Sequence, residues 1–457
     1  MPPAFALLHL ALAAPVCGPL DVEGALAVAA QGADEIAIRK AELAAAEADL
    51  ALARAARLLP IGTLTALTGL VPEAHGDFRN PEPQATNRSL RGLGPYIRTD
   101  LSIAQPIFTW GQLDAARDAA TSGVRAREEL VTDKLSELRV RIAQLFWGET
   151  LARRLLAIAA DVEQNLAQVD EKLEELLASG EASVKPADRY RLDVYKADLR
   201  KRKAEAQRGL DVAHGGLAAT LGLPPAALTL REVALPLDPG EVPDVARERE
   251  RAGRQRPDVA ALEFGIAARD GEVRAAEAAL KPQVFVGGMF SFAYAPNRTP
   301  QLNPWINDEF NHVAGGVALG LRQDLALPLL RARAEKARAE RETLRRQREG
   351  LGRLVAQQVG EAVAQVQAAR ERLLAATSAV RSGKAWFRSE GLDFEAGVGE
   401  PKDLLDAYAA YVQLQVDQLQ AAYDLVVARA RLAQAAGDPP RAGPSPCAAG
   451  DGDAVPR

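Results

Sequence analysis

The chain has 457 residues, of which 48% are hydrophobic and 26% are charged, so it is long enough for two or three ordinary domains and too hydrophobic to be disordered. Its net charge is −5 and its pI is about 5.7. Because basic residues lie beside acidic ones rather than in a patch, this balance argues against a nucleic-acid-binding protein. Aromatic residues make up only 5%, a composition typical of long helices with narrow apolar seams.

The N-terminal segment predicts export. Residues Ala4 to Ala14 resemble the hydrophobic part of a signal peptide, with Ala11-Leu12-Ala13 as the cleavage site, so we expect a signal peptide over 1–13. The pattern is atypical, because no Lys or Arg precedes the apolar run. No later window has eighteen uninterrupted apolar residues, so a membrane-spanning helix is not expected.

Both cysteines lie near the ends of the chain. Cys17 follows Val16, whereas a lipoprotein signal favours a small residue directly before the cysteine, so lipidation of Cys17 is the weaker interpretation. Cys447 lies in a Pro/Gly/Ala-rich tail, 438–457, which we expect to be disordered. If Cys17 is removed or lipidated, no internal disulfide is available.

One structural unit occurs twice along the chain, with an offset of about 215 to 222 residues. In each copy an Ala/Arg-rich helical pattern stops at a proline, Pro60 or Pro282, and strand-like residues follow at once. The corresponding segments are 51–69 and 273–291, 100–120 and 319–339, and 187–199 and 402–414. We therefore expect a first structural repeat over 25–222, a connector over 223–256 and a second repeat over 257–437.

The helical segments carry apolar residues at alternating steps of four and three, as coiled coils do. Between 131 and 176, residues such as Leu138 and Ile142 form a seam that buries one stripe of the helix against its neighbours. Residues 111–178 contain no proline, so this helix could extend for roughly 100 Å at 1.5 Å per residue. The predicted helices cover 30–59, 111–178, 187–221, 257–281, 327–393 and 401–437.

Four segments alternate between apolar and small or polar residues. They cover about 61–70, 96–103, 284–294 and 313–321. This pattern is typical of outer-membrane barrel strands, and the alternative is an amphipathic sheet in a soluble protein. Four strands leave open edges, which cannot persist in lipid, so copies must share a barrel. Two copies give a barrel that side chains fill, whereas three give twelve strands and a lumen, so we predict a homotrimer.

Phe108 and Trp110 lie where the second predicted strand passes into a helix. Aromatic residues at such a place fit the inner membrane interface. Simple packing explains them equally well, so the sequence leaves both roles open.

Several short motifs occur in an order and spacing that resembles the TolC family of outer-membrane factors, over about residues 25–437. They are the turn Gln105 to Phe108 followed by Trp110-Gly111, the opening Arg256-Pro257-Asp258-Val259 of the second repeat, and Gly397 followed by Asp403-Leu404-Leu405-Asp406-Ala407. The resemblance implies a mainly α fold with a small β part, in which a trimeric twelve-stranded outer-membrane β-barrel continues into a long periplasmic α-helical coiled-coil barrel.

The same resemblance implies a location and a set of partners. The protein would lie in the cell outer membrane, in contact with outer-membrane lipid, and extend into the periplasm. There it would meet a periplasmic adaptor, also called a membrane fusion protein. An inner-membrane transporter of the resistance-nodulation-division, ABC or similar type would complete the system.

In members of the family, an acidic pair like Asp403 and Asp406 rings the closed periplasmic entrance. The two residues are three apart at the start of a helix, hence on one face, and a three-fold axis would collect six carboxylates. The alternative is helix-terminal charge and capping. Relatives often have Tyr and Arg where this chain has Phe394 and Gly399, so the same hydrogen-bonded latch cannot form. Asp188 is a weaker gate candidate, whose alternative role is a helix cap.

The sequence predicts no catalytic residue, no metal site and no cofactor, because its four histidines are scattered and no nucleophile, phosphate-binding or zinc-protease motif occurs. We therefore predict a non-enzymatic outer-membrane duct subunit of a tripartite efflux or secretion system, which passively conducts substrates exported by an inner-membrane pump. The alternative is a periplasmic coiled-coil adaptor or scaffold, which would not need the duplicated strands.

Overall fold

The computed structural model describes residues 18–440 except 59, 77–91, 180–184, 302, 304, 306 and 397. The predicted signal peptide, Cys17, Cys447 and most of the predicted tail lie outside the described residues. The chain divides into two compact units. The helical unit consists of Met1–Leu43, Arg127–Leu262 and Arg348–Arg457, and the sheet unit consists of Ala44–Ala126 and Glu263–Gln347. Each unit therefore takes segments from both predicted repeats.

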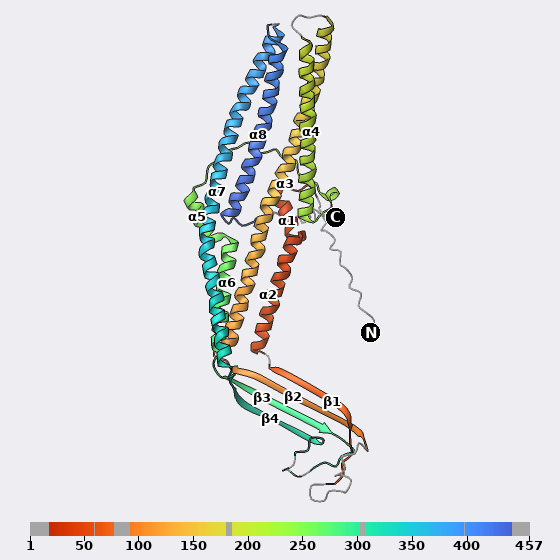
Figure 1. Ribbon diagram of the computed structural model, residues 1–457, viewed down its shortest axis with the longest axis vertical. Coiled ribbons are helices and arrows are strands. Elements are labelled where there is room, and N and C mark those ends of the chain that lie inside the picture. The colour runs from red at the N-terminus through yellow and green to blue at the C-terminus, as the bar shows by residue number, and fades with distance from the viewer. Residues whose placement is uncertain are drawn as a thin grey trace, which may run out of the picture. The chain divides into compact units, whose positions relative to one another are not determined.

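The sheet unit contains one antiparallel sheet of four strands in the order β1-β2-β3-β4 (Figure 1). The strands are β1 (Ile61–Val71), β2 (Gly94–Phe108), β3 (Gln283–Tyr294) and β4 (His312–Arg322). Each of the four segments with alternating residues forms one of them. Within the described part of the chain, β1 and β4 each pair with one strand only, so each leaves one edge unpaired.

Strand β2 is longer than the predicted 96–103 and corrects one expectation. The segment Gln105 to Phe108 is not a turn but the last part of this strand. Pro106 has no backbone N–H to donate, and the pairing of β2 with β3 shifts register between Pro106 and Phe108. A local irregularity of this kind is how a strand tolerates proline.

Four helices contribute to the sheet unit. They are α2 (Asp34–Leu58), α3 (Gln112–Ser179), α6 (Pro257–Ala278) and α7 (Leu327–Glu395). Helix α6 approaches α3 closely at Gly271, where a Cβ atom would lie 2.8 Å from the carbonyl oxygen of Ala115. An ion pair of 2.6 Å between Arg338 and Glu277 joins α7 to α6.

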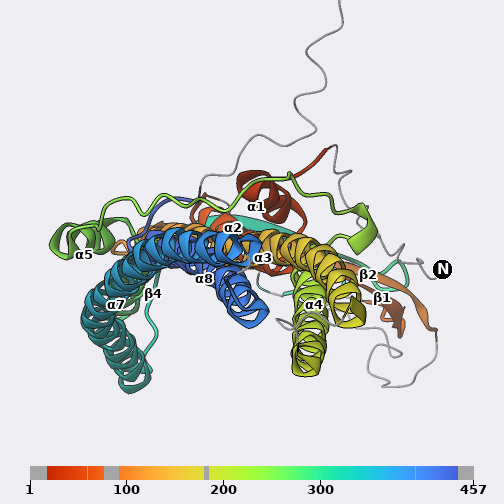
Figure 2. The ribbon, with the colours of Figure 1, turned by 90° about the horizontal axis from the view of Figure 1, so that it is seen from above.

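The helical unit contains the remaining parts of α2, α3, α6 and α7 and four further helices. These are α1 (Val22–Gly32), α4 (Pro186–Leu221), α5 (Val245–Gln255) and α8 (Pro401–Ala435). Figures 1 and 2 show α4 beside α3 and α8 beside α7. Pro186 and Pro401 occupy the first positions of α4 and α8, where a missing N–H costs nothing. Among the described residues, no helix has both the length and the apolar content needed to cross a membrane.

The predicted helix 30–59 is two helices, and its first part begins earlier than expected. Helix α1 starts after Asp21, whose side chain accepts a hydrogen bond of 2.8 Å from the backbone N–H of Gly24. Ala33 adopts an extended conformation between α1 and α2. No proline marks this break, but α1 ends at a glycine, Gly32, which has low helix propensity.

The predicted seam of α3 is buried where α1, α2 and α4 pack against it. Leu138 is 1% exposed, and it shares a core cluster with Ile142, Phe146, Leu26 and Leu217. Steps of four and three therefore identified the buried stripe of this helix. Burial of such side chains contributes on the order of 2 kcal/mol each.

The connector between the two repeats runs along α3 and α8 before it enters α5 (Figure 2). It contains a short 3-10 helix, Pro225–Ala227. Leu20 pairs with it in parallel fashion, donating its backbone N–H to the carbonyl of Thr229 at 2.9 Å and accepting from the N–H of Arg231 at 2.8 Å. The segment before α1 is thereby tied to the connector.

Asp133 on α3 gives the helical unit a predictable pH dependence. Burial raises the pKa of this carboxyl to about 6, and the nearby carboxylates of Asp258 and Glu137 contribute to the shift. Since the pKa is higher in the folded than in the unfolded chain, the charged form is disfavoured on folding, and the associated stability is lost as the pH rises from about 4 to about 6. Asp133→Asn should therefore stabilise the protein by about 1 kcal/mol at pH 7.5, after allowance for solvent screening.

Thermal unfolding followed by circular dichroism checks this expectation. The stability difference between Asp133→Asn and the unaltered protein should shrink as the pH falls to about 4, because the carboxyl is then protonated in both states. Asp193→Asn, at an exposed position of α4, serves as the control. A difference that stays constant from pH 4 to 7.5 would contradict the assignment.

Candidate functional site

The predicted acidic pair lies in the first turns of α8, directly after the connection from α7. Asp403 is exposed, and within the described residues no cation pairs with its carboxylate. Asp406 lies one turn further along the helix and is only half-exposed. The two carboxylates therefore have different environments, which their spacing alone did not indicate.

Asp406 on α8 is hydrogen-bonded to helix α4 of the same chain. The hydroxyl of Tyr195 on α4 donates a hydrogen bond of 2.6 Å to its Oδ1 atom. Burial, and then the hydrogen bond to Asp406, raise the pKa of Tyr195 to about 12. The hydroxyl thus remains a donor throughout the physiological pH range, and the bond connects α4 with α8.

Two further contacts reinforce this connection. The side-chain amide of Asn165 on α3 donates to the hydroxyl of Tyr408 on α8 at 2.7 Å, and Arg202 on α4 donates to Gln413 on α8 at 2.5 Å. The apolar residues between them form a buried cluster of the helical unit. Its fully buried members are Val162, Leu166, Leu173 and Leu192. Hydrogen bonds therefore surround an apolar cluster where α8 packs against α3 and α4.

Asp188, the weaker gate candidate, lies in the first turn of α4. Asp188 is only 6% exposed, and its Oδ2 atom accepts a hydrogen bond of 2.9 Å from the backbone N–H of Lys185. Its Oδ1 atom lies 3.5 Å from the guanidinium of Arg191. The carboxylate closes the first turn of α4, which is the helix-cap role given as the alternative, and its role at a gate stays a prediction.

Phe394 lies in the last turn of α7, and Gly399 lies in the connection between α7 and α8. The backbone N–H groups of Val398 and Gly399 both donate to the carbonyl of Asp393, at 3.0 and 2.9 Å. A Cβ atom at Gly399 would lie 2.8 Å from the backbone nitrogen of Phe394. A side chain such as arginine does not fit at Gly399 in this conformation, which is a physical reason for the departure from the relatives.

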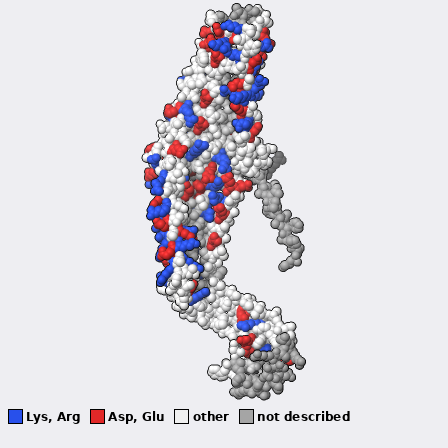
Figure 3. Space-filling model, viewed as in Figure 1, with Lys and Arg blue, Asp and Glu red and all other residues white. Residues whose placement is uncertain are grey.

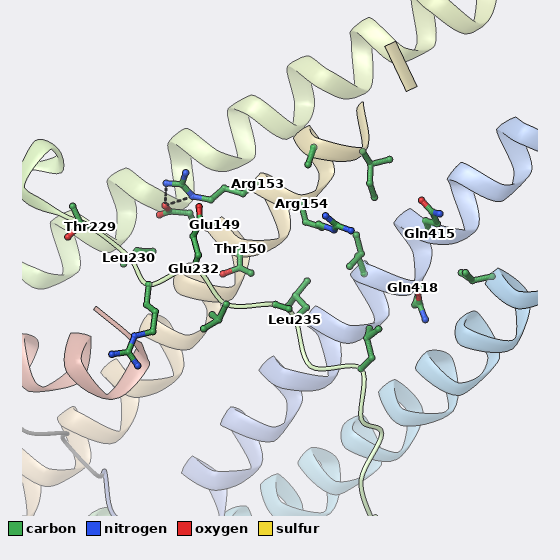
Figure 4. A pocket seen from close by; sticks show the side chains of 18 of the residues that line it. Glu149, Thr150, Arg153, Arg154, Thr229, Leu230, Glu232, Leu235, Gln415 and Gln418 are labelled. Carbon is green, nitrogen blue, oxygen red and sulfur yellow. Dashed lines mark hydrogen bonds and ion pairs between the residues drawn. The ribbon is translucent and has the colours of Figure 1, made fainter. Parts of the chain in front are cut away.

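A cleft of about 1090 Å³ lies between the connector, α3 and α8 (Figure 4). At its edge Glu149, which is 1% exposed, accepts hydrogen bonds from Arg153 at 2.6 Å and from His214 at 3.0 Å. The other ring nitrogen of His214 lies 3.0 Å from the carbonyl oxygen of Pro225. Both ring nitrogens of His214 therefore lie within hydrogen-bonding distance of an oxygen atom.

The two faces of the sheet differ in chemistry. The strand register places large apolar side chains on one face, among them Leu64, Leu70, Ile97, Leu101, Ile103, Val286, Phe290, Val317, Leu319 and Leu321. The other face carries mostly small or polar residues, among them Thr63, Thr65, Arg98, Asp100, Ser102, Ser291, Ala314, Gly316 and Ala318, together with the apolar Ile61, Leu67, Phe285 and Met289. Charged side chains of both signs cover the helices, whereas the sheet is mostly uncharged in the view of Figure 3.

The apolar face is uncovered in a single chain. Val317 is 81% exposed and Leu319 is 71% exposed. An apolar surface of this extent requires an apolar environment or a partner. Since the opposite face is small and polar, the sheet has the two-sided character of a barrel wall with lipid outside and water inside.

Phe108 and Trp110 pack against each other at the end of β2, with ring centroids 4.9 Å apart. The indole N–H of Trp110 donates to the carbonyl of Pro282 at 2.7 Å, and the ammonium of Lys281 lies 4.9 Å from the ring centroid. Trp110 has a positive φ of 55°, a strained conformation that these contacts hold in place. The structure thus gives both aromatic residues a packing role, while about half of each remains exposed.

The described residues hold no group of three or more His, Cys, Asp or Glu side chains that could bind a metal ion. Two histidines instead have a hydrogen-bond partner at each ring nitrogen. His214 lies at the connector, and His312 at the start of β4 lies 2.8 Å from Ser291. Sequence reasoning missed both contacts and Tyr195, because their partners are distant in sequence.

Comparison with known proteins finds one family match. Residues 249–438, less than half of the chain, match the family model of outer membrane efflux proteins. The match supports the family predicted from the sequence and the predicted function of an outer-membrane efflux duct. The predicted fold class is confirmed by the solved structures that share it.

Solved channels share the fold of this chain over nearly its whole length. The outer-membrane channel OprN is 19% identical, with 92% of this chain and 90% of that chain covered and a TM-score of 0.71. VceC from Vibrio cholerae is 18% identical, with coverages of 91% and 96% and a TM-score of 0.71. The open state of MtrE from Neisseria gonorrhoeae is 17% identical, with coverages of 91% and 88% and a TM-score of 0.70. No curated protein matches the chain.

Proposed function

We propose that three copies of this chain form one duct that lies in the outer membrane and extends into the periplasm. The observation that carries the proposal is the four-stranded sheet, which has one apolar face, one small or polar face and two unpaired edges among the described residues. Unpaired edges are not stable in lipid. Pairing β1 of one copy with β4 of the next removes them, and three copies give a twelve-stranded barrel with a lumen.

A periplasmic adaptor and an inner-membrane pump complete the proposed system. The duct itself conducts passively, and the pump supplies the energy. Phe108 and Trp110 would lie at the inner membrane interface, where the indole and phenyl rings meet headgroups and Lys281 stays near water. The alternative of an adaptor or scaffold loses its support, because the family match and the shared fold are those of outer-membrane channels.

We further propose separate roles for the two acidic residues at the entrance. Asp403, exposed and unpaired within the described residues, would give a three-fold ring of carboxylates that favours cations. Asp406 would hold the entrance closed through its bond to Tyr195. This bond would replace the latch that Phe394 and Gly399 exclude.

Conductance of the purified full-length protein in planar lipid bilayers tests the proposed duct. We expect discrete channels from the trimer and none from heat-dissociated chains. Stable insertion without conductance, or no insertion at all, would contradict the proposed function.

Tyr195→Phe tests the latch. The variant keeps the ring but removes the hydroxyl, and a hydrogen bond to a charged acceptor contributes about 1.5 to 3 kcal/mol, so the open population in single-channel recordings should rise about tenfold. Tyr190→Phe, which alters a 72% exposed tyrosine on the same helix, is the matched control. Asp403→Asn should leave the open population unchanged and lower the preference for cations. A Tyr195→Phe channel that opens no more often than the control would refute the latch.

A further inference from the structure

Four polar side chains from three adjacent strands form a continuous hydrogen-bonded chain on the small, polar face of the sheet. Arg98 on β2 pairs with Asp100 at 2.8 Å. Ser291 on β3 lies 2.6 Å from Asp100 Oδ1. His312, the first residue of β4, places its Nε2 atom 2.8 Å from the Ser291 hydroxyl. The chain lies near the end of the sheet that connects β3 to β4.

The geometry of this polar chain constrains the protonation of His312. Its Nδ1 atom lies 2.8 Å from the carbonyl oxygen of Asp308, and since a carbonyl can only accept, Nδ1 carries a proton. The hydroxyl of Ser291 has a single proton, which it donates to Asp100. Its oxygen is then an acceptor toward Nε2, so Nε2 must also carry a proton. Every donor finds an acceptor only when the imidazole is positively charged.

The neutral imidazole leaves one contact unsatisfied. Ser291 would then have to donate to Nε2, and its oxygen would face the carboxylate of Asp100 at 2.6 Å without a proton between them. Imidazole is the side chain whose charge ordinarily changes between pH 5 and 8. The two protonation states of His312 therefore differ both in charge and in the direction of the Ser291 hydrogen bond.

Other charged groups near His312 have partners of their own. The carboxylate of Asp308 accepts from the backbone N–H groups of Gln301, Phe310 and Asn311, at 2.9, 2.9 and 3.1 Å. The guanidinium of Arg298 lies 3.9 Å from the ring centroid of Phe310. Tyr96 on β2 packs edge-on against the same Phe310 ring, and Glu309 is exposed in the adjoining loop. Arg98 and Asp100 cancel each other in charge, so His312 decides the net charge of the polar chain.

We propose that His312 is a selectivity-determining residue at the external mouth of the duct. The proposal rests on the proposed trimeric barrel, in which the small, polar face lines the lumen and the loops after β1 and β3 lie outside the cell. Protonation of His312 then adds one positive charge per subunit, three in all, to a polar chain in which Arg98 and Asp100 balance each other. External acid would thereby weaken the preference of the duct for cations and raise its relative permeability to small anions.

Reversal potentials in planar bilayers with a KCl gradient test this inference on the full-length trimer. Only the external side is changed from pH 7.5 to pH 5, so that the entrance carboxylates stay at neutral pH. The permeability ratio of chloride to potassium should rise about twofold in the unaltered channel. His312→Gln should abolish this rise, and His312→Arg should show the high ratio at both pH values.

His75→Gln is the matched control, because His75 lies in the loop after β1 and contacts Glu73 at 3.6 Å rather than the polar chain. The His75→Gln channel should show the same rise in the chloride-to-potassium permeability ratio at external pH 5 as the unaltered channel. Ser291→Ala is a second variant that retains the imidazole but breaks its link to Asp100, so the response should move to lower pH. Channels of His312→Gln that respond to external acid as the control does would overturn this inference alone, whereas the absence of any channel would overturn the proposed duct as well.

Discussion

Leu138→Asp should abolish assembly of the folded protein. Leu138 lies on α3, is 1% exposed, and packs with Ile142 and Phe146 in a core cluster that joins α1, α2, α3 and α4. A carboxylate at this position would be buried without a partner. Such a change costs about 5 kcal/mol, a large part of the stability of an ordinary domain.

The yield of heat-modifiable trimer from detergent extracts measures this effect. Gln164→Asp introduces the same side chain at an exposed position of the same helix and should give a normal yield. Equal yields from the two variants would contradict the packing of the α3 seam.

The second large effect is expected in the sheet. Leu319→Arg places a guanidinium on the apolar face of β4, next to Val317 and Leu321. If this face contacts lipid, the substitution costs about 2 to 4 kcal/mol near the bilayer midplane. The neighbouring Ala318→Arg projects the same side chain from the opposite, small and polar face, so it should cost much less.

Unfolding of both variants by guanidinium in lipid vesicles gives the comparison. The difference between Leu319→Arg and Ala318→Arg is the informative quantity, since strand propensity and side-chain size are shared. A larger loss from Ala318→Arg would reverse the assignment of the two faces.

Much of the fold was predictable because it follows local rules. Pro60, Pro186, Pro257 and Pro401 mark helix boundaries through their missing N–H groups, and alternating residues mark the strands. The two errors at element ends arose where tertiary contacts decide the structure. β2 continues through Pro106 because the register shift accommodates it, and α1 ends at Gly32, after which Ala33 is extended.

The candidate site was only partly predictable. The gate role of the acidic pair was implied by the family resemblance and stays a prediction, and the sequence treated Asp403 and Asp406 as equivalent. Tyr195 separates them, and it precedes Asp406 by 211 residues, so no local pattern reveals the bond. Asp188 shows the converse case, because its counterpart position in the repeat suggested a gate, whereas its own first turn uses it as a cap.

The His312 contact was missed for a similar reason. A lone histidine at the start of a strand has no motif, and its environment is created only when β2, β3 and β4 pair in register. A sequence pattern does not reveal a contact that needs three strands to pair in register. Only the order and register of the strands place His312 beside Ser291.

The most direct test of the shared barrel is the behaviour of the full-length protein in fractionated cells. The account predicts that it sediments with the outer membrane, requires detergent for extraction, and migrates as a trimer that dissociates only on heating. A monomer that is released without detergent would contradict the account, because a single chain leaves both edges of its sheet and its apolar face uncovered.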